Sequence, residues 1–337
     1  MDKSLTMISV LFAFTPFWVK KYEQPNLRMG ETSLKLIEPY SKNTTFHFTD
    51  FLGNGVEIHP NGKEIKLPLS KNTEVMYYDS NLFIDASGQV TFSKKTFFLG
   101  SPIAAAPIQY KNFYIFLLRN DTVVALDFEG KQKWKVSHLF QENFHTQKKA
   151  PMLLHENSVY IACSNGVIKK IDVETGKIYW QNFIDSVGFF KDIDLQPKIF
   201  KNFLVASSFS GPTVFIDILS GKNVHVFDYN LLDEIIETET GLLLPTPLSL
   251  FVLDKTYKII QEISLGSRKT HFRKFSKGYL TADNQGKIYY LDHDFKEKYS
   301  FEFGMNSSII SKIFIQENSF AFYSSKNRLY FFQEKKL

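Results

Sequence analysis

Five aspartates recur in this sequence at nearly regular distances, each at the end of a short apolar run. Calcium ions take oxygen ligands, so several such carboxylates brought together could hold one. The spacings between successive aspartates are 45, 45, 37 and 38 residues, so each segment of chain contributes only one. This recurrence indicates a structural corner rather than a single active site. The five are Asp127, Asp172, Asp217, Asp254 and Asp292.

Other residues that do chemistry are sparse and show no catalytic spacing. The single cysteine, Cys163, excludes an internal disulfide and a cysteine-based zinc site. The eight histidines are scattered, with His138 and His145 in one expected loop and His293 in an expected turn. No G-x-S-x-G, H-E-x-x-H or phosphate-loop pattern is present. We therefore expect no catalytic residue, no metal site and no bound cofactor, so the chain is not predicted to be an enzyme.

The composition is that of a folded protein rich in strands. Of the 337 residues, 44% are hydrophobic and 22% are charged, which is typical of a globular chain. Aromatic residues make up 16%, and they favour half-buried strands. The net charge is +5, with lysines and acidic residues interspersed along the chain. This pattern predicts a solvated surface and no nucleic-acid partner.

Residues 5–19 form one apolar run near the N-terminus. The run is shorter than the ~20 residues that a membrane-spanning helix needs. Its length fits the hydrophobic region of a signal peptide, but no A-x-A-like cleavage site follows, and no cysteine follows that could carry a lipid. Two interpretations of residues 1–30 stay open: an export or anchor segment, or a strand folded into the rest of the chain.

The chain repeats one unit of structure. In "SVYIACSNGVIKKIDVETGKIYWQNF", from residue 158, an apolar strand, a polar turn, a strand ending in Asp, a Gly-Lys turn and another strand follow one another. Similar copies begin at 112 and 202, and weaker ones at 44, 81, 241, 278 and 319. A further short apolar run precedes each copy, so each unit contains four strands. Eight units account for residues 31–337, and residues 1–30 lie outside them.

A repeat of ~40 residues with four strands predicts the blade of a β-propeller, because one such sheet has two apolar faces that it buries only against neighbouring sheets. We expect an all-β, eight-bladed propeller of four-stranded antiparallel blades. The last copy leaves little chain for its outermost strand, so we expect an N-terminal strand within 17–24 to close the ring. Trp134 and Trp180 share one offset from the Gly of their turns, which predicts that each covers the gap to an adjacent blade.

The stretch "IDVETGKIYW", residues 171–180, resembles the x-D-x-x-T-G-K-x-x-W motif of quinoprotein-type (PQQ-like) propeller blades. Two further stretches, 126–134 and 216–225, keep parts of it. The resemblance implies one of two functions. One branch of the family contains dehydrogenases that use pyrroloquinoline quinone, and the other contains non-catalytic scaffolds such as BamB, which serve outer-membrane protein assembly. The motif residues of the three central blades are Asp127, Gly130, Trp134, Asp172, Gly176, Trp180, Asp217 and Gly221.

The dehydrogenase branch commonly holds its quinone with a pair of adjacent cysteines, which one cysteine cannot supply. The scaffold branch is therefore the main prediction: a protein-interaction platform in the cell envelope or periplasm, bound to a larger membrane-associated complex. Three alternatives stay open, namely a PQQ-dependent dehydrogenase-like enzyme, a structural subunit of another surface complex, and a cytoplasmic location. Peripheral association with a membrane is also compatible with the sequence.

The longest connections between blades are the candidate partner-binding surface. In a propeller the connections between blades share one face with the turns between the second and third strands. The connections at 137–149, 184–194 and 228–237 contain apolar residues where a surface loop should be polar. A weaker candidate is a basic loop at 266–277. The candidate partner-binding residues are Phe140, Phe144, His145, Phe189, Phe190, Leu231 and Leu232.

Overall fold

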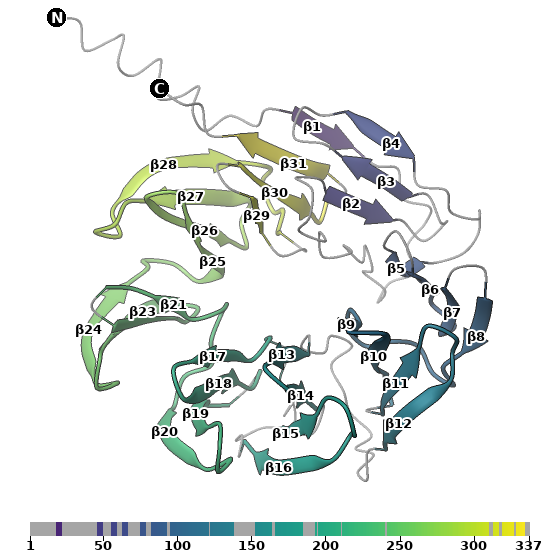
Figure 1. Cartoon of the computed structure of the whole chain (residues 1–337). Coiled ribbons are helices and arrows are strands. Elements are labelled where there is room, and N and C mark those ends of the chain that lie inside the picture. The colour runs from purple at the N-terminus through teal and green to yellow at the C-terminus, as the bar shows by residue number, and fades with distance from the viewer. Residues whose placement is uncertain are drawn as a thin grey trace, which may run out of the picture. The chain divides into compact units, whose positions relative to one another are not determined.

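A computed structural model of the chain describes most residues from 82 onward and a few short strands before them (Figure 1). Within the described residues all long regular elements are β-strands, and no helix there is long and apolar enough to cross a membrane. The described residues are 18–21, 46–49, 55–58, 63–66, 75–78, 82–92, 95–120, 122–137, 152–163, 166–184, 193, 195–209, 211–239, 241–309, 313–316, 319–326 and 328–333.

The described strands form eight antiparallel sheets, seven of four strands and one of three. In six of the four-stranded sheets the strands follow one another in chain order. Apart from one N-terminal strand, each of these sheets falls within one of the repeat copies that the sequence predicts, while the number of blades in a closed ring stays a prediction. The prediction of an all-β fold made of four-stranded antiparallel sheets, a β-propeller, is thereby confirmed.

The chain divides into two compact units, which we describe separately. The first unit contains Met1–Asn72, Ile236–Asp254 and Lys258–Leu337, and the second contains Thr73–Ile235 with Lys255–Tyr257. The second unit thus takes three residues from a turn that lies far along the chain from its main segment.

The second unit consists of four sheets (Figure 1). In three of these sheets the second strand is buried over four or five consecutive residues, as in Phe113–Leu117 and Ser158–Ala162. Its strands are β5 (Val75–Tyr78), β6 (Leu82–Asp85), β7 (Gln89–Phe92), β8 (Lys95–Phe98), β9 (Ile108–Tyr110), β10 (Phe113–Leu117), β11 (Val123–Asp127), β12 (Gln132–Val136), β13 (Leu153–His155), β14 (Ser158–Ala162), β15 (Val167–Asp172), β16 (Ile178–Phe183), β17 (Lys198–Phe200), β18 (Phe203–Ser207), β19 (Thr213–Asp217) and β20 (Asn223–Phe227).

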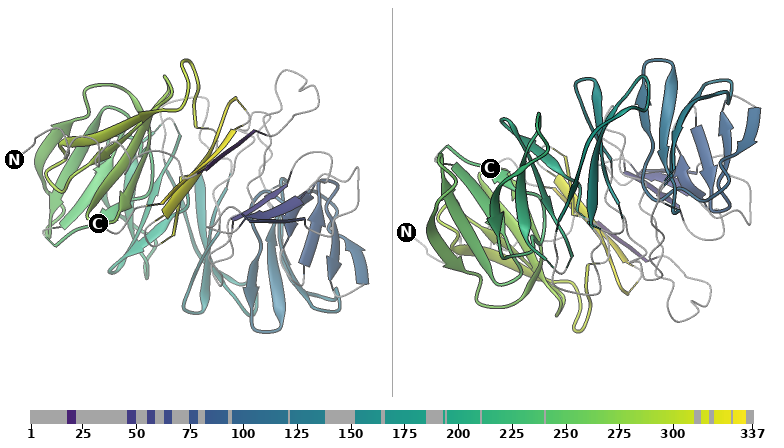
Figure 2. Two further views of the ribbon diagram at one scale, coloured as in Figure 1. Left: turned by 90° about the horizontal axis from the view of Figure 1, so that it is seen from above. Right: turned by 90° about the horizontal axis from the view of Figure 1, so that it is seen from below.

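Neighbouring sheets of the second unit lie beside one another (Figure 2), and their apolar side chains form shared core clusters. One core cluster joins the β9–β12 sheet to the β13–β16 sheet and includes Ile115, Trp134 and Ile171. Another joins the β13–β16 sheet to the β17–β20 sheet and includes Tyr160 and Ile216. The β13–β16 sheet is therefore stabilised by contacts on both of its faces, as the repeat requires.

The first unit contains the other four sheets. In one of them β1 pairs with β31 in antiparallel register, with Trp18 opposite Phe331, so a strand from the expected 17–24 segment lies beside the last strand of the chain. The strands are β1 (Trp18–Lys21), β2 (Phe46–Thr49), β3 (Gly55–Ile58), β4 (Glu64–Lys66), β21 (Ile236–Glu237), β22 (Gly241–Pro245), β23 (Ser249–Asp254), β24 (Ile259–Ser264), β25 (Lys269–Phe275), β26 (Gly278–Asp283), β27 (Lys287–Leu291), β28 (Glu297–Glu302), β29 (Phe314–Gln316), β30 (Ser319–Ser324) and β31 (Arg328–Gln333).

The prediction of a basic loop at 266–277 is wrong. Most of this stretch is strand β25, in which Phe272 and Phe275 are buried while Lys274 is exposed. Phe272 and Phe275 are three residues apart and therefore point to opposite faces of the sheet, so the strand shows no simple alternation, and its lysines and arginine resemble a loop. Phe275 packs in the core between this sheet and the last one, where its ring lies 5.2 Å from that of Phe320.

Candidate protein-interaction site

The recurring aspartates close the turns that lead into the outermost strand of each sheet, which we call the outer turns. The Oδ1 atom of Asp127 accepts backbone N–H bonds from Glu129 and Lys131, both at 2.9 Å. Asp292 does the same with Asp294 and Lys296, again at 2.9 Å. These bonds satisfy backbone donors that the turn would otherwise leave without partners.

Asp172 forms the most complete version of this corner. Its Oδ1 atom accepts the backbone N–H groups of Glu174 at 3.1 Å and Thr175 at 2.8 Å, together with the hydroxyl of Thr175 at 2.8 Å. Its Oδ2 atom accepts the Tyr179 hydroxyl at 2.6 Å. In the outer turns of two other sheets, Asp217 accepts from Ser220 and Asp254 accepts from Lys258.

This geometry does not fit the quinone and calcium site of the dehydrogenase branch. The corner carboxylates are bonded within their own turns, and Cys163 is buried in the core of the second unit. In the part of the chain that the structure describes, no group of three or more His, Cys, Asp or Glu side chains could hold a metal ion. No catalytic step is therefore assigned to these residues.

The corner bonds lower the pKa of three carboxyl groups. The Tyr179 hydroxyl is the main cause for Asp172, the Ser220 backbone N–H for Asp217, and the Lys296 backbone N–H for Asp292. A carboxyl whose pKa is lower in the folded state stabilises the fold above its unfolded pKa, which is about 4. This stabilisation is lost as the pH falls through the folded pKa.

We expect the free energy of unfolding to be steady near neutral pH and to fall below about pH 4. The substitution Asp172→Asn removes the charge of this acceptor and replaces Oδ2, which accepts the Tyr179 hydroxyl, with an amide group, so it should lower stability at pH 7 and flatten the acid dependence. Urea denaturation at several pH values measures both effects. Asp228→Asn is the matched control, because Asp228 is exposed and closes no outer turn. If the free energy of unfolding depends on pH in the same way in the two variants, then Asp172 does not stabilise the fold through its corner bonds.

Outer turns also lock neighbouring sheets together. The indole N–H of Trp134, on β12, donates to the Val173 carbonyl oxygen in the next sheet at 3.0 Å. Its ring lies flat over Gly176, where an added Cβ would come within 2.8 Å of the indole. Trp180 repeats this arrangement one sheet later, with its N–H on the Ile218 oxygen at 3.1 Å and its ring over Gly221. The motif therefore forms one joint: a tryptophan of one sheet covers the glycine of the following outer turn.

Between the β17–β20 sheet and the outer turn that follows Asp254, the roles of strand and turn in this joint are reversed. His225 stands where the two preceding sheets have tryptophan, and Tyr257 stands at the glycine position of the following outer turn, with a φ of 66°. The two rings lie 5.1 Å apart, and Tyr257 also contacts Phe203 and Phe215. The large ring now comes from the turn instead of the strand. This contact explains why residues 255–257 belong to the second unit.

The candidate surface lies at the end of the β17–β20 sheet that is opposite its outer turn. Residues 228–235, here called the 228–235 connection, lead away from β20 and lie beside the β18–β19 turn. Several hydrogen bonds hold the connection in place. Thr213 Oγ1 donates to the Tyr229 oxygen at 2.7 Å, Asn230 Nδ2 donates to the Phe209 oxygen at 3.2 Å, and the Leu231 N–H donates to Ser207 Oγ at 2.9 Å.

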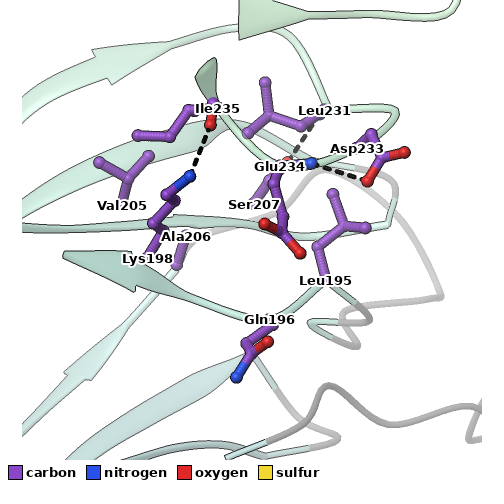
Figure 3. A pocket seen from close by; sticks show the side chains of 10 residues that line it. All are labelled: Leu195, Gln196, Lys198, Val205, Ala206, Ser207, Leu231, Asp233, Glu234 and Ile235. Carbon is purple, nitrogen blue, oxygen red and sulfur yellow. Dashed lines mark hydrogen bonds between the residues drawn. The ribbon is translucent and has the colours of Figure 1, made fainter. Parts of the chain in front are cut away.

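A small pocket opens beneath the connection (Figure 3). Leu231 and Ile235 line it from the connection, Val205 and Ser207 from β18, and Lys198 from β17. The Lys198 ammonium group donates to the Ile235 carbonyl oxygen at 3.1 Å, which fixes the far end of the connection. The connection is thus held at its beginning, middle and end.

Large apolar side chains are exposed along this ordered backbone. Phe209, in the β18–β19 turn, is 49% exposed, and Tyr229 is 45% exposed. Leu231 and Leu232 are half-buried between them and the core. An aromatic pair on a fixed backbone can bury much apolar area against a partner with little loss of conformational freedom. We define Phe209, Tyr229, Leu231 and Leu232 as the apolar surface.

A sequence model of the family described as Outer membrane protein assembly factor BamB matches residues 65–270, more than half of the chain. The chain belongs to this family. The resemblance to PQQ-like propellers that the repeat motif indicated is confirmed. The BamB of Francisella salina is 25% identical over 182 residues, which are 50% of this chain and 32% of that protein. The match therefore spans about a third of the length of that curated relative.

Solved structures show the same fold. The crystal structure of BamB from Moraxella catarrhalis superposes with a TM-score of 0.72 at 14% identity, covering 95% of this chain and 99% of the other. The computationally designed Ika8 protein gives 0.64 at 15% identity, covering 90% and 98%. Sqt1 of Saccharomyces cerevisiae gives 0.63 at 10% identity, covering 90% and 96%. At such identities these likenesses concern the BamB-type fold alone.

Only part of the predicted partner-binding set can be compared with the structure. Leu231 and Leu232 lie on the 228–235 connection as expected, half-buried and not fully exposed. The other predicted residues lie outside the described part of the chain: Phe140, Phe144, His145, Phe189 and Phe190.

Sequence reasoning missed Phe209 and Tyr229. The signal for Phe209 was available, since "SSFSGP" places a phenylalanine among serine, glycine and proline in a tight turn, where a buried side chain is not expected. Tyr229 lies within the 228–237 connection that sequence reasoning singled out, but only the two leucines of that connection were chosen there.

Proposed function

We propose that this protein is a non-catalytic interaction scaffold of the BamB type, which acts in the cell envelope in the assembly of outer-membrane proteins. It binds a protein of the assembly complex, and the apolar surface of the second unit is part of the docking site. Membership of a family described as an outer-membrane protein assembly factor supports this role. The relatives from Francisella salina and Moraxella catarrhalis carry the same BamB name.

The proposal rests on one observation: the apolar surface exposes large aromatic side chains, while hydrogen bonds fix the backbone that bears them. Phe209 and Tyr229 are about half exposed, yet hydrogen bonds to Asn230 and Thr213 hold the backbone at both residues. Exposed aromatic side chains on a monomer mark interaction sites more often than scattered aliphatic ones do. A preordered backbone lowers the entropy lost on binding, so the affinity comes from a small number of anchors.

The longer connections at 137–149 and 184–194 extend the proposal. They follow the two sheets that precede β17–β20, so their residues belong to the same class of connection. We include Phe140, Phe144, His145, Phe189 and Phe190 as further partner contacts. The partner is thus expected to span the connections of neighbouring sheets in the second unit.

Capture of the membrane-embedded subunit of the same organism's outer-membrane assembly complex tests the proposal. We expect Phe209→Asp and Tyr229→Asp each to weaken binding at least about 30-fold, as the loss of an interface hot spot of about 2 kcal/mol would. A charged group would also remain desolvated in the docked complex. Biolayer interferometry with purified proteins measures the dissociation constant.

Leu219→Asp is the matched control, because Leu219 is 80% exposed on the outer turn, at the other end of the same sheet. It should bind like the parent chain. The pair Phe140→Asp and Phe144→Asp tests the 137–149 connection separately. Unchanged binding by both aromatic variants of the apolar surface, with melting temperatures like that of the parent chain, would refute docking at this surface.

A further inference from the structure

The fold of the first unit buries one lysine, Lys269, without a carboxylate partner. It is the first residue of β25 and is 6% exposed, and its backbone N–H donates to the Pro247 carbonyl oxygen at 2.7 Å, in the β22–β23 turn of the preceding sheet. Its ammonium nitrogen lies 3.9 Å from the centre of the Tyr289 ring and donates to Ser267 Oγ at 2.9 Å. Lysine is almost never buried to this extent unless it is paired.

The carboxylate that lies opposite Lys269 is already occupied. Asp283 is the register partner of Lys269 across β25 and β26. Its Oδ1 atom accepts the backbone N–H groups of Gln285 at 2.9 Å and Lys287 at 3.0 Å, and its Oδ2 atom accepts the Tyr289 hydroxyl at 2.7 Å. Within the described residues Lys269 forms no ion pair.

The charge on Lys269 is therefore only partly compensated. An ammonium group has three N–H donors, and in the described structure Ser267 Oγ is the one acceptor that Lys269 reaches. Burial lowers the pKa of Lys269, because surroundings without water disfavour the charged form. Lys287 adds a second positive charge, since its ammonium nitrogen lies 4.8 Å from the centre of the same Tyr289 ring. A bound anion would offset both charges.

We propose that Lys269, Ser267 and Lys287 form a binding site for a small oxyanion. Ser267 is exposed, so the ammonium group that it contacts lies directly below the surface. Because Ser267 Oγ accepts from Lys269, its own hydroxyl proton can be donated to the anion. Hydrogen bonds between ammonium groups and oxyanions are among the strongest in proteins.

The same oxyanion chemistry has two sources, namely a free phosphate ion and the carboxylate of an acidic side chain on another protein. The site lies in the first unit, whereas the apolar surface lies in the second. The inference therefore does not depend on the proposed function.

Thermal unfolding of the full chain with increasing inorganic phosphate, at constant ionic strength, tests the site. We expect a saturable rise of the melting temperature, by about 3–5 °C when phosphate reaches about ten times its dissociation constant. Phosphate also stabilises proteins because it is excluded from their surfaces, but that effect does not saturate at a site and is shared by every variant.

Lys269→Met should weaken phosphate binding at least about tenfold, because it removes an ammonium donor. Without phosphate the same variant should melt at a higher temperature than the parent chain, because an apolar side chain replaces a buried charge that lacks a carboxylate partner. Lys274→Met is the matched control, since Lys274 is exposed on the same strand, and it should match the parent chain in both measurements. Ser267→Ala leaves the core intact and should also weaken binding, so it tests the site if Lys269→Met does not fold.

A short polyglutamate peptide, used in place of phosphate, distinguishes the two sources of the oxyanion. A saturable rise with phosphate supports a free anion as the ligand, and a rise with the peptide alone supports an acidic side chain of another protein. No saturable rise with either probe would overturn the proposal. So would an equal rise in the parent chain and in both the Lys269→Met and Ser267→Ala variants.

Discussion

Trp134→Ala is expected to lower the free energy of unfolding of the second unit by about 3–5 kcal/mol, which is the usual cost of removing a buried large aromatic side chain. Trp134 is 6% exposed and lies in the core cluster between the β9–β12 and β13–β16 sheets. Its loss would leave a cavity over Gly176 and a Val173 carbonyl oxygen without its donor. Urea denaturation followed by far-UV circular dichroism measures the change.

Gly176→Ala tests the same joint from the other side. Gly176 has a φ of 73°, so alanine there is strained by about 1–2 kcal/mol, and its methyl group would press into the indole ring at 2.8 Å. Overpacking of this kind adds about 1–3 kcal/mol. Gly100→Ala is the matched control, because Gly100 has a φ of 84° with nothing within 4 Å of an added Cβ. Equal losses for the two variants would show that Trp134 does not press on the turn.

The second large effect concerns the reversed joint at Tyr257. We expect Tyr257→Gly to destabilise the second unit by about 2–3 kcal/mol, because ring contacts with His225, Phe203 and Phe215 outweigh the relief of an unfavourable φ. His225→Trp alone should also destabilise it, since Tyr257 occupies the space that the indole needs. The double variant restores the tryptophan-over-glycine joint of the other sheets and should recover most of the loss.

The coupling between the two substitutions should be about 1–3 kcal/mol in a double-mutant cycle measured by urea denaturation. The control cycle pairs Tyr257→Gly with His225→Ala, which supplies no ring, so its coupling is limited to the lost contact between His225 and Tyr257 and the double variant should be no more stable than Tyr257→Gly. If His225→Trp likewise fails to raise the stability of Tyr257→Gly, then the two ring positions do not substitute for each other across the joint.

These joints show what could be predicted from the sequence and what could not. The repeat was readable because each copy uses the same local chemistry: an aspartate that bonds its own turn and a glycine that tolerates a positive φ, as at Asp172 and Gly176. The tryptophans were readable through their constant offset. The reversed joint could not be predicted in this way. Tyr257 replaces the glycine of the motif, and the sequence does not show that its ring contacts His225, which replaces the tryptophan.

Two further aspartates that close turns could have been predicted from the sequence but were overlooked. Asp85 and Asp283 accept backbone N–H bonds in the turns between the second and third strands, for example from Gln89 at 3.0 Å and Lys287 at 3.0 Å. Both begin a D-x-x-G sequence, which is the same signal as in the outer turn at Asp127. The aspartate corner therefore occurs at both ends of a sheet, which strengthens its interpretation as a structural element.

The apolar surface was harder to predict for a physical reason. Exposure depends on tertiary packing, which local sequence does not specify, so the sequence could single out Leu231 and Leu232 as surface residues but could not show that they are only partly exposed. Phe209 and Tyr229 are more exposed than either leucine. A hydrophobic residue in a turn signals a candidate, and only the packing of the connection decides which side chain faces outward.

The central claim is that the aspartate corners maintain the fold while the apolar surface binds the partner. Melting temperature and partner dissociation constant, measured together on Asp172→Asn and on the double variant Phe209→Asp with Tyr229→Asp, test it most directly. The account predicts that Asp172→Asn lowers the melting temperature and keeps the dissociation constant at temperatures where it is folded, and that the double variant does the reverse. Loss of binding by a fully folded Asp172→Asn, with binding retained by the double variant, would contradict it.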